Sequence, residues 1–166
     1  MLTVVASAIA ASTELDEILE DVRQDYDVDH ISNVEFNKID SEDVIVFDVR
    51  QKKEYKVSHL KGAIQLDPDT SADDFFKQHA DKLKGKVAVF YCSVGQRSSR
   101  MLSKLKNRLP EVGVDQAFNL EGGAFKWSND NIEFVRNGEA TKDVHPYNAY
   151  WGRLVNNKDA IKYKAE

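Results

Sequence analysis

The chain has 166 residues, 42% of them hydrophobic and 31% charged, and it carries a net charge of −5. This composition excludes a disordered or fibrous protein, and the length favours one domain. The acidic balance disfavours a nucleic-acid partner, because phosphate binding needs a basic face, and the single cysteine excludes an internal disulfide or a CxxC metal or redox pair.

The first twelve residues, MLTVVASAIAAS, are apolar and mostly small. Residues 8–10 (AIA) resemble a signal-peptide cleavage site, although no Lys or Arg precedes the apolar stretch. The stretch is too short to span a bilayer, so we expect no stable membrane insertion. The expected location is cytoplasmic, with a periplasmic or secreted location as the alternative if residues 1–12 are a clipped signal peptide.

A helix is expected next, because Thr13 and Asp16 resemble a capping box and apolar residues follow at helical spacing up to Val22. Strands and helices then alternate along the chain. Short apolar runs predict strands at residues 44–47, 62–66, 87–91 and 115–120. Further helices are predicted from the N-cap Ser71 to Gly85, from about residue 98 to 109, and from the glycine pair 122–123 to Trp127.

This alternation predicts an α/β domain of three layers, in which helices flank a mainly parallel central sheet. We divide the chain into an N-terminal segment with one helix at 1–27, a main domain at 28–130, and a C-terminal tail at 131–166 that packs on the core. The tail contains VHPYNAYWGRL (144–154), which has no clear helical or strand period. We interpret its aromatic residues as packing groups rather than as the lining of a ligand groove.

The only cysteine, Cys92, directly follows the predicted strand at 87–91 and precedes a predicted helix. In such a sheet, ligands bind outside the carboxyl ends of the strands, where loop amides and a helix N-terminus attract anions. Gly95 lets the loop curl tightly, and Arg97 adds a permanent positive charge. These features favour a thiolate, so we expect Cys92 to be a sulfur nucleophile with a lowered pKa rather than a small core residue.

Three motifs, in order, resemble those of the rhodanese-type sulfurtransferases. CSVGQRSS (92–99) is similar to that family's active-site loop, in which Cys, two residues, Gly, one residue, Arg and then Ser or Thr follow each other. FDVR (47–50) with EYKVSHLKGAIQL (54–66) is similar to its Asp-x-Arg and Glu…His-x-x-Gly-Ala motifs, and NLEGGAFKW (119–127) to its double Gly and Trp. One departure is Ser58, where the family usually has Gly before the His.

The resemblance implies a rhodanese domain at 28–130 that acts as a thiosulfate sulfurtransferase. The Cys92 thiolate would take the outer sulfur of thiosulfate or another sulfane donor and pass it to a thiol, cyanide or a protein acceptor, with no cofactor and no metal. Cys92 and Arg97 would be catalytic, Arg97 as the charge that binds the anionic donor. The residues expected to bind substrate are Ser93, Val94, Gly95, Gln96 and Ser98, and those expected to support the loop are Asp48, Arg50, Glu54, His59 and Ser99.

Two pairs among the supporting residues are expected to be structural. Asp48 and Arg50 are placed to form an ion pair at a strand end, and Glu54 and His59 a scaffold pair in the turn that follows. A role for His59 as an acid–base catalyst is the minor alternative. The basic residues at 100, 104, 106 and 108 are expected to form the solvated face of a helix.

Three other functions fit the same residues. A cysteine phosphatase of the cell-cycle dual-specificity type resembles rhodaneses in fold, but it has five residues between Cys and Arg where this chain has four, and a smaller loop suits one sulfur atom better than a phosphoryl group. A rhodanese-like module could instead bind a partner without catalysis. A sulfur carrier could accept persulfide from a desulfurase, and the sequence does not separate it from a thiosulfate enzyme, because both need the same nucleophile and loop.

Overall fold

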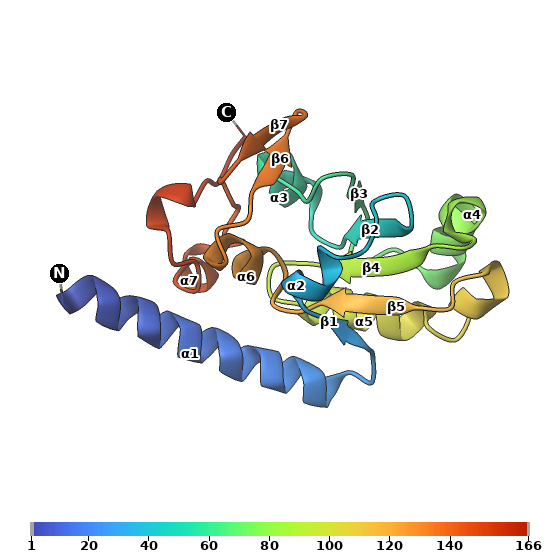
Figure 1. Cartoon of the computed structure of the whole chain (residues 1–166), viewed down its shortest axis with the longest axis horizontal. Helices are drawn as coiled ribbons and strands as arrows, with labels where there is room; N and C mark the ends of the chain where they lie inside the picture. Colours follow the sequence, from blue (N-terminus) through green and yellow to red (C-terminus); the bar gives the residue numbers. More distant parts are fainter. Residues whose placement is uncertain (1, 166) are drawn as a thin grey trace.

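Five parallel strands form the central sheet of the computed structural model, which describes the backbone of residues 2–165 and the side chains of residues 13–165. The strand order is β1-β5-β4-β2-β3 (Figure 1). The bounds are His30–Ile31 for β1, Val44–Asp48 for β2, Ile64–Gln65 for β3, Val87–Tyr91 for β4 and Ala117–Leu120 for β5. Since β4 is the middle strand, the loop that follows it lies at the centre of the carboxyl edge of the sheet.

Helices lie on both faces of this sheet (Figure 1). The bounds are Leu2–Asp25 for α1, Asn33–Phe36 for α2, Lys52–Val57 for α3, Ala72–Leu83 for α4, Gln96–Leu105 for α5, Gly123–Asn129 for α6 and Ala149–Gly152 for α7. Two 3₁₀ turns, η1 at Leu109–Val112 and η2 at Lys158–Ala160, complete the described helical segments. Ser71 caps α4 as predicted, because its side chain accepts a hydrogen bond from the backbone of Asp74.

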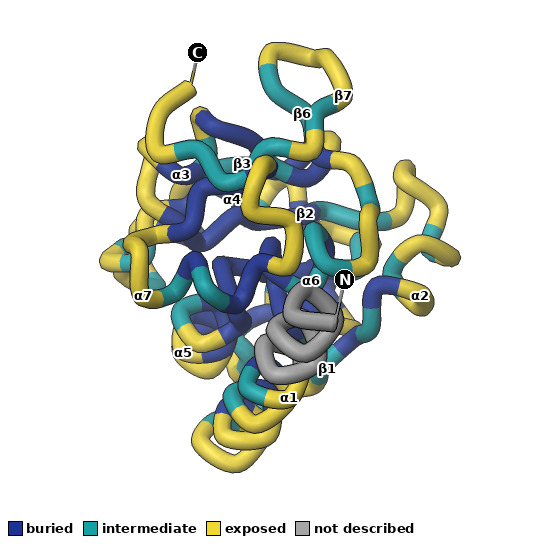
Figure 2. Tube along the Cα trace, turned by 90° about the vertical axis from the view of Figure 1, so that its left-hand side faces the viewer, coloured by how far each residue is buried: buried dark blue, intermediate teal, exposed yellow. Residues whose placement is uncertain are grey.

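The core has two parts because successive strand residues point to opposite faces. Phe47 and Phe90 pack with α4 and α5 on one face. Val46 and Val89 pack with α1, α6 and the C-terminal tail on the other face. Figure 2 shows the buried residues gathered in the strands and on the inward sides of the helices. The predicted three-layer α/β fold with a mainly parallel sheet is therefore confirmed.

Two predicted helix boundaries are wrong. Helix α1 begins at Leu2, so Thr13 lies inside the helix and not at its N-cap. Helix α5 begins at Gln96, inside the predicted loop, and ends at Leu105, after which η1 forms a separate turn. The side chains of the predicted signal remnant at 1–12 lie outside the described residues. No helix in the described part of the chain is long and apolar enough to cross a membrane.

The C-terminal tail contains more regular structure than the sequence predicted. Strands β6 (Phe134–Arg136) and β7 (Glu139–Thr141) form an antiparallel hairpin, and Figure 1 shows this hairpin beside α3. A backbone bridge between His59 and Val135 holds it there. Val144, Leu154, Val155 and Ala160 are buried, so the tail contributes to the core.

Candidate active site

The loop after β4 wraps around the sulfur of Cys92. The backbone N–H of Gly95 donates to the Cys92 Sγ over 3.2 Å. Gly95 has a φ of 102°, and a Cβ at this position would lie 3.0 Å from the Asn119 side-chain nitrogen. The Ser98 hydroxyl donates a hydrogen bond to the side-chain oxygen of Asn119, Oδ1, over 2.6 Å. Asn119 of β5 therefore holds the turn in which the loop becomes helix α5.

Cys92 is buried, with 1% of its surface exposed. Burial raises the pKa of its thiol, but the charge of Arg97 and hydrogen bonds from Ser98 and from the backbone of Val94 act in the opposite direction and prevail. The pKa of Cys92 consequently lies below its ordinary value, in the direction that the sequence predicted. The thiolate is the nucleophilic form of cysteine, so the loop stabilises the reactive state.

Arg97 forms a two-point ion pair with Glu54 of α3. Its Nη1 and Nη2 donate to the two carboxylate oxygens over 2.8 and 2.9 Å, and Nη2 also donates to the Ser93 hydroxyl over 2.9 Å. Glu54 is fully buried, and burial by itself raises the pKa of its carboxyl. The contacts with Arg97 lower this pKa by more than burial raises it, so the carboxyl is ionised. These bonds use one N–H of Nη1 and both N–H groups of Nη2, so only the second N–H of Nη1 and the Nε–H of Arg97 remain for a donor anion.

The predicted pairing of Glu54 with His59 is wrong, because Glu54 binds Arg97 instead. The ring of His59 stacks on Tyr55 with 3.8 Å between ring centres, and its Nδ1 lies 3.0 Å from the Tyr55 carbonyl oxygen. Neither His59 nor Ser99 lines the pocket at Cys92, and the buried Ser99 hydroxyl has no hydrogen-bond partner among the described residues. The described side chains also hold no cluster of three His, Cys, Asp or Glu that could bind a metal.

The expected ion pair between Asp48 and Arg50 is present and completely buried. Nε and Nη2 of Arg50 donate to the two Asp48 oxygens over 2.8 and 2.6 Å, and Nη2 also donates to the Ser58 carbonyl over 2.7 Å. The Tyr91 hydroxyl donates to Asp48 as well. Ser58 has a φ of −172°, an extended conformation open to any residue, so the departure from the family's Gly causes no backbone strain. The pair supports the carboxyl ends of β2 and β4 from inside the fold.

The start of α6 forms backbone hydrogen bonds with the loop at Cys92. The backbone N–H groups of Ala124 and Phe125 donate to the carbonyl oxygens of Cys92 and Ser93 over 2.8 and 3.0 Å. Gly123 has a φ of 51°, and a Cβ there would lie 2.3 Å from the Cys92 carbonyl oxygen. Gly123 therefore lets the start of α6 approach the backbone of the loop more closely than a side chain would permit.

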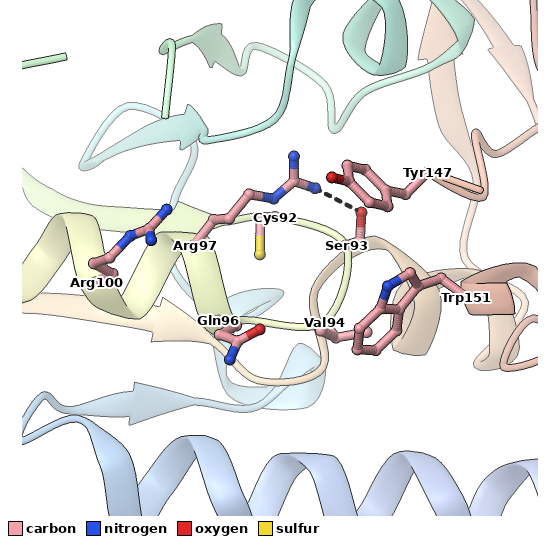
Figure 3. Close-up of a pocket in the computed structure, with 8 residues that line it drawn as sticks. All are labelled: Cys92, Ser93, Val94, Gln96, Arg97, Arg100, Tyr147 and Trp151. Carbon is pink, nitrogen blue, oxygen red and sulfur yellow. Dashed lines mark hydrogen bonds between the residues drawn. The ribbon is translucent and has the colours of Figure 1, made fainter. Parts of the chain in front are cut away.

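A pocket of about 270 Å³ opens beside Cys92 (Figure 3). The predicted loop residues that line it are Ser93, Val94, Gln96 and Arg97, whereas Gly95 and Ser98 do not line it. Three lining residues were not predicted: Arg100 of α5, and Tyr147 and Trp151 of the tail. The sequence pattern predicts packing roles for the aromatic residues of the tail and a solvated helix face for Arg100.

The comparison with protein families explains this combination of loop and sheet. The family model of the rhodanese-like domain matches residues 35–130, which is more than half of the chain. The chain belongs to the rhodanese-like domain family. The match contains Cys92, Arg97 and the supporting residues in β2 and α3, so this rhodanese-like domain includes the candidate site apart from the aromatic residues of the tail.

Two curated relatives of this rhodanese-like domain differ in the activity that their names give. A tRNA uridine(34) hydroxylase of Cytophaga hutchinsonii is 30% identical over 128 residues, which is 72% of this chain and 40% of the relative. An M-phase inducer phosphatase of Caenorhabditis elegans, cdc-25.3, is 32% identical over 103 residues, which is 56% of this chain and 31% of the phosphatase. The chain thus spans less than half the length of either protein.

A solved structure confirms the fold of this rhodanese-like domain. The crystal structure of a thiosulfate sulfurtransferase from Pseudomonas aeruginosa aligns with 82% of this chain and 24% of that chain, at a TM-score of 0.54 and 15% identity. At this identity the similarity concerns the arrangement of strands and helices and not the reaction.

Proposed function

We propose that the protein is a sulfurtransferase of the rhodanese type, which moves a sulfane sulfur through a persulfide on Cys92. The observation that carries the proposal is the loop around the Cys92 sulfur, with an N–H donor at 3.2 Å from Sγ and a pKa below the ordinary value. A thiolate held in this way is an activated nucleophile without a general base. No lining residue would have to remove a proton during the reaction.

In the first half-reaction the Cys92 thiolate attacks the outer sulfur of thiosulfate. A sulfur–sulfur bond forms to Sγ, the bond between the two sulfurs of thiosulfate breaks, and its electron pair leaves with sulfite. The persulfide that remains carries one negative charge, as the thiolate did. The charge of Arg97, which already lowers the pKa of Cys92, would stabilise that persulfide anion as well.

In the second half-reaction an acceptor nucleophile attacks the terminal sulfur of the persulfide. Cyanide would leave as thiocyanate, and a thiolate would leave as a new persulfide, while Cys92 returns to its thiolate form. Because the enzyme alternates between two covalent states, the kinetics should be of the ping-pong type. A protein acceptor or a desulfurase donor would use the same two steps.

The loop length favours sulfur transfer over phosphatase chemistry. Four residues separate Cys92 from Arg97, one fewer than in the phosphatase loops that bind a tetrahedral phosphoryl group. The similarity to the nematode phosphatase therefore supports a common fold more than a common reaction.

The name of the Cytophaga relative suggests a second candidate, the hydroxylation of a tRNA uridine. The 30% identity over 128 residues favours it, while the net charge of −5 and the coverage of 40% of that relative's length argue against it for this chain alone. Binding of labelled tRNA at about 0.1 M salt, measured by gel shift, would support this candidate.

The test of sulfur transfer is to incubate the protein with thiosulfate and to measure its intact mass and the sulfite released. We expect an adduct of one sulfur atom and an equal amount of sulfite, both lost in Cys92→Ser. Hydrolysis of an aryl phosphate without an adduct would replace the proposal by the phosphatase. Neither activity in a folded protein would favour a module that binds a partner without catalysis.

A further inference from the structure

The pocket at Cys92 contains one cation that the proposed chemistry has not used. Arg100 lies on α5, three residues after Arg97, so the two side chains are neighbours on one face of the helix and both line the pocket. Figure 3 shows Arg100 to the left of the Cys92 sulfur, whereas the Arg97 guanidinium lies above the sulfur, next to Tyr147. Arg100 is exposed, and its guanidinium makes no ion pair or hydrogen bond within the described residues.

The two arginines therefore differ in what they can bind. Arg97 and Glu54 together carry no net charge, since Arg97 donates to Glu54 and to Ser93, and Glu54 also accepts from the backbone N–H of Gln51. Arg100 retains its full charge and all its donors for an incoming group. A guanidinium presents several N–H donors in a planar fork that fits sulfonate and carboxylate oxygens. The anion-binding role predicted for Arg97 fits Arg100 better.

The opposite wall of the pocket is aromatic. Tyr147 is 40% exposed and its ring faces Arg97, with 5.1 Å between the guanidinium carbon and the ring centre. Its φ is 66°, a left-handed conformation that is unfavourable for a residue other than glycine. A hydrogen bond from the Tyr147 N–H to the buried His145 holds this conformation, at 2.9 Å. Trp151 lies beside it on α7 and adds a second apolar surface.

The size of the pocket exceeds what an inorganic anion needs. A volume of about 270 Å³ corresponds to about nine water molecules in the liquid, at about 30 Å³ each. Thiosulfate would fill a part of it next to the sulfur and would leave the aromatic wall uncovered. The combination of a free guanidinium, a nucleophilic sulfur and two aromatic rings suits an anion with an apolar body.

We propose that Arg100, Tyr147 and Trp151 form a subsite for an organic anionic sulfur donor such as an aryl thiosulfonate. Arg100 would bind the sulfonyl oxygens, and the aromatic wall would contact the organic group. The Cys92 thiolate would then take the outer sulfur and release the sulfinate, which leaves with the electron pair of the broken sulfur–sulfur bond. This assignment rests on the proposed function for its substrate, but its charge selectivity can be tested without sulfur transfer.

The first experiment compares the alkylation of Cys92 by iodoacetate and by iodoacetamide. Both reagents transfer a carbon to the thiolate and release iodide, but only iodoacetate is an anion. The ratio of the two rates cancels any change in the thiolate fraction. We expect Arg100→Gln to lower this ratio about fivefold, as for the loss of one exposed charge pair. Lys104→Gln removes the same charge one turn farther along α5 and should leave the ratio nearly unchanged.

The second experiment measures kcat/KM for methanethiosulfonate and benzenethiosulfonate anions. The wild-type protein should prefer the aryl donor, and Trp151→Ala should reduce that preference about tenfold, since it removes most of a buried aromatic contact. Arg100→Gln should weaken both donors equally. Circular dichroism and the urea midpoint of Trp151→Ala establish that the variant is folded; if it is not, Trp151→Leu replaces it.

The outcomes separate the subsite from the proposed function. If no donor reacts but the alkylation ratio depends on Arg100, the anion subsite stands and sulfur transfer is wrong. If the protein transfers sulfur but Arg100→Gln leaves the ratio of the iodoacetate and iodoacetamide rates unchanged, the subsite is wrong and the proposed sulfurtransferase function stands. A wild-type protein in which neither alkylating reagent reacts also overturns the subsite, because Cys92 would not be reached from this pocket.

Discussion

Replacing Gly123 with Ala would test whether the position of the loop at Cys92 depends on its close contact with the start of α6. The added methyl group would lie 2.3 Å from the carbonyl oxygen of Cys92 and 3.0 Å from the carbonyl carbons of Cys92 and Ser93. These are backbone atoms, so no side-chain rotation relieves the contact. Either the start of α6 or the loop itself has to move, by about 1 Å if normal contact distances are to be restored.

The free-energy cost has two parts. The φ of 51° is unfavourable for alanine by roughly 1–3 kcal/mol. Movement would also weaken the hydrogen bonds from Ala124 and Phe125 to the loop, at about 1 kcal/mol each. The sum is about 3–5 kcal/mol, a large part of the roughly 5–15 kcal/mol that stabilises a typical domain.

The control is Gly62→Ala. Gly62 has a similar positive φ of 75°, but a Cβ there would meet no atom within 4 Å. It therefore has the backbone strain without the collision, and should cost about 1 kcal/mol. Urea unfolding of both variants gives the two free energies, and iodoacetamide alkylation reports whether Cys92 has moved. Equal unfolding free energies and an unchanged alkylation rate in Gly123→Ala would refute the reasoning.

Three further predictions concern the charged groups. The alkylation rate of Cys92 should reach half its maximum at a pH below the ordinary thiol pKa of about 8.5, and Arg97→Gln should move that midpoint up. A midpoint that stays in place would mean that Arg97 does not stabilise the thiolate. Glu54→Gln should lower the free energy of unfolding in urea by about 3–5 kcal/mol, because it leaves Arg97 without its partner. The unpaired charge of Arg97 should also lower the pH midpoint of Cys92 alkylation. An upward movement of that midpoint would contradict the pairing of Glu54 with Arg97. Tyr91→Phe removes the hydroxyl that donates to Asp48, so it should lower the free energy of unfolding in urea by about 1–3 kcal/mol. An unchanged free energy of unfolding would contradict this role of the hydroxyl.

The sequence predicted the parts of the fold that depend on neighbouring residues. The apolar runs of β2, β4 and β5 and the cap of α4 are short-range patterns, and all four appear near their predicted positions. Strand β1 was missed because His30–Ile31 is only two residues long and is a strand only through its pairing with β5. The capping-box pattern at Thr13 predicts a helix start there, whereas α1 begins eleven residues earlier at Leu2, so this local pattern does not act as a cap.

The site was predicted where its residues follow each other and missed where distant segments meet. The loop at Cys92 could be recognised from eight consecutive letters. The pair of Glu54 and Arg97 joins residues 43 positions apart, and no local pattern distinguishes it from a pair with His59. Tyr147 and Trp151 reach the pocket only because the hairpin β6–β7 and the buried Val144 lead the tail back across the sheet edge.

Cys92 and the aromatic residues Tyr147 and Trp151 therefore belong to parts of the molecule that differ in local stability against unfolding. Strand β4, which Cys92 directly follows, is paired with β2 over all its residues and with β5 at residues 88–90, so its amides should exchange with deuterium only when the whole domain unfolds. The segment that carries Tyr147 and Trp151 is a single layer of chain, partly exposed, and its amides should exchange through local openings. A substrate larger than the pocket could thus be admitted by displacement of the tail while the reacting sulfur stays in place.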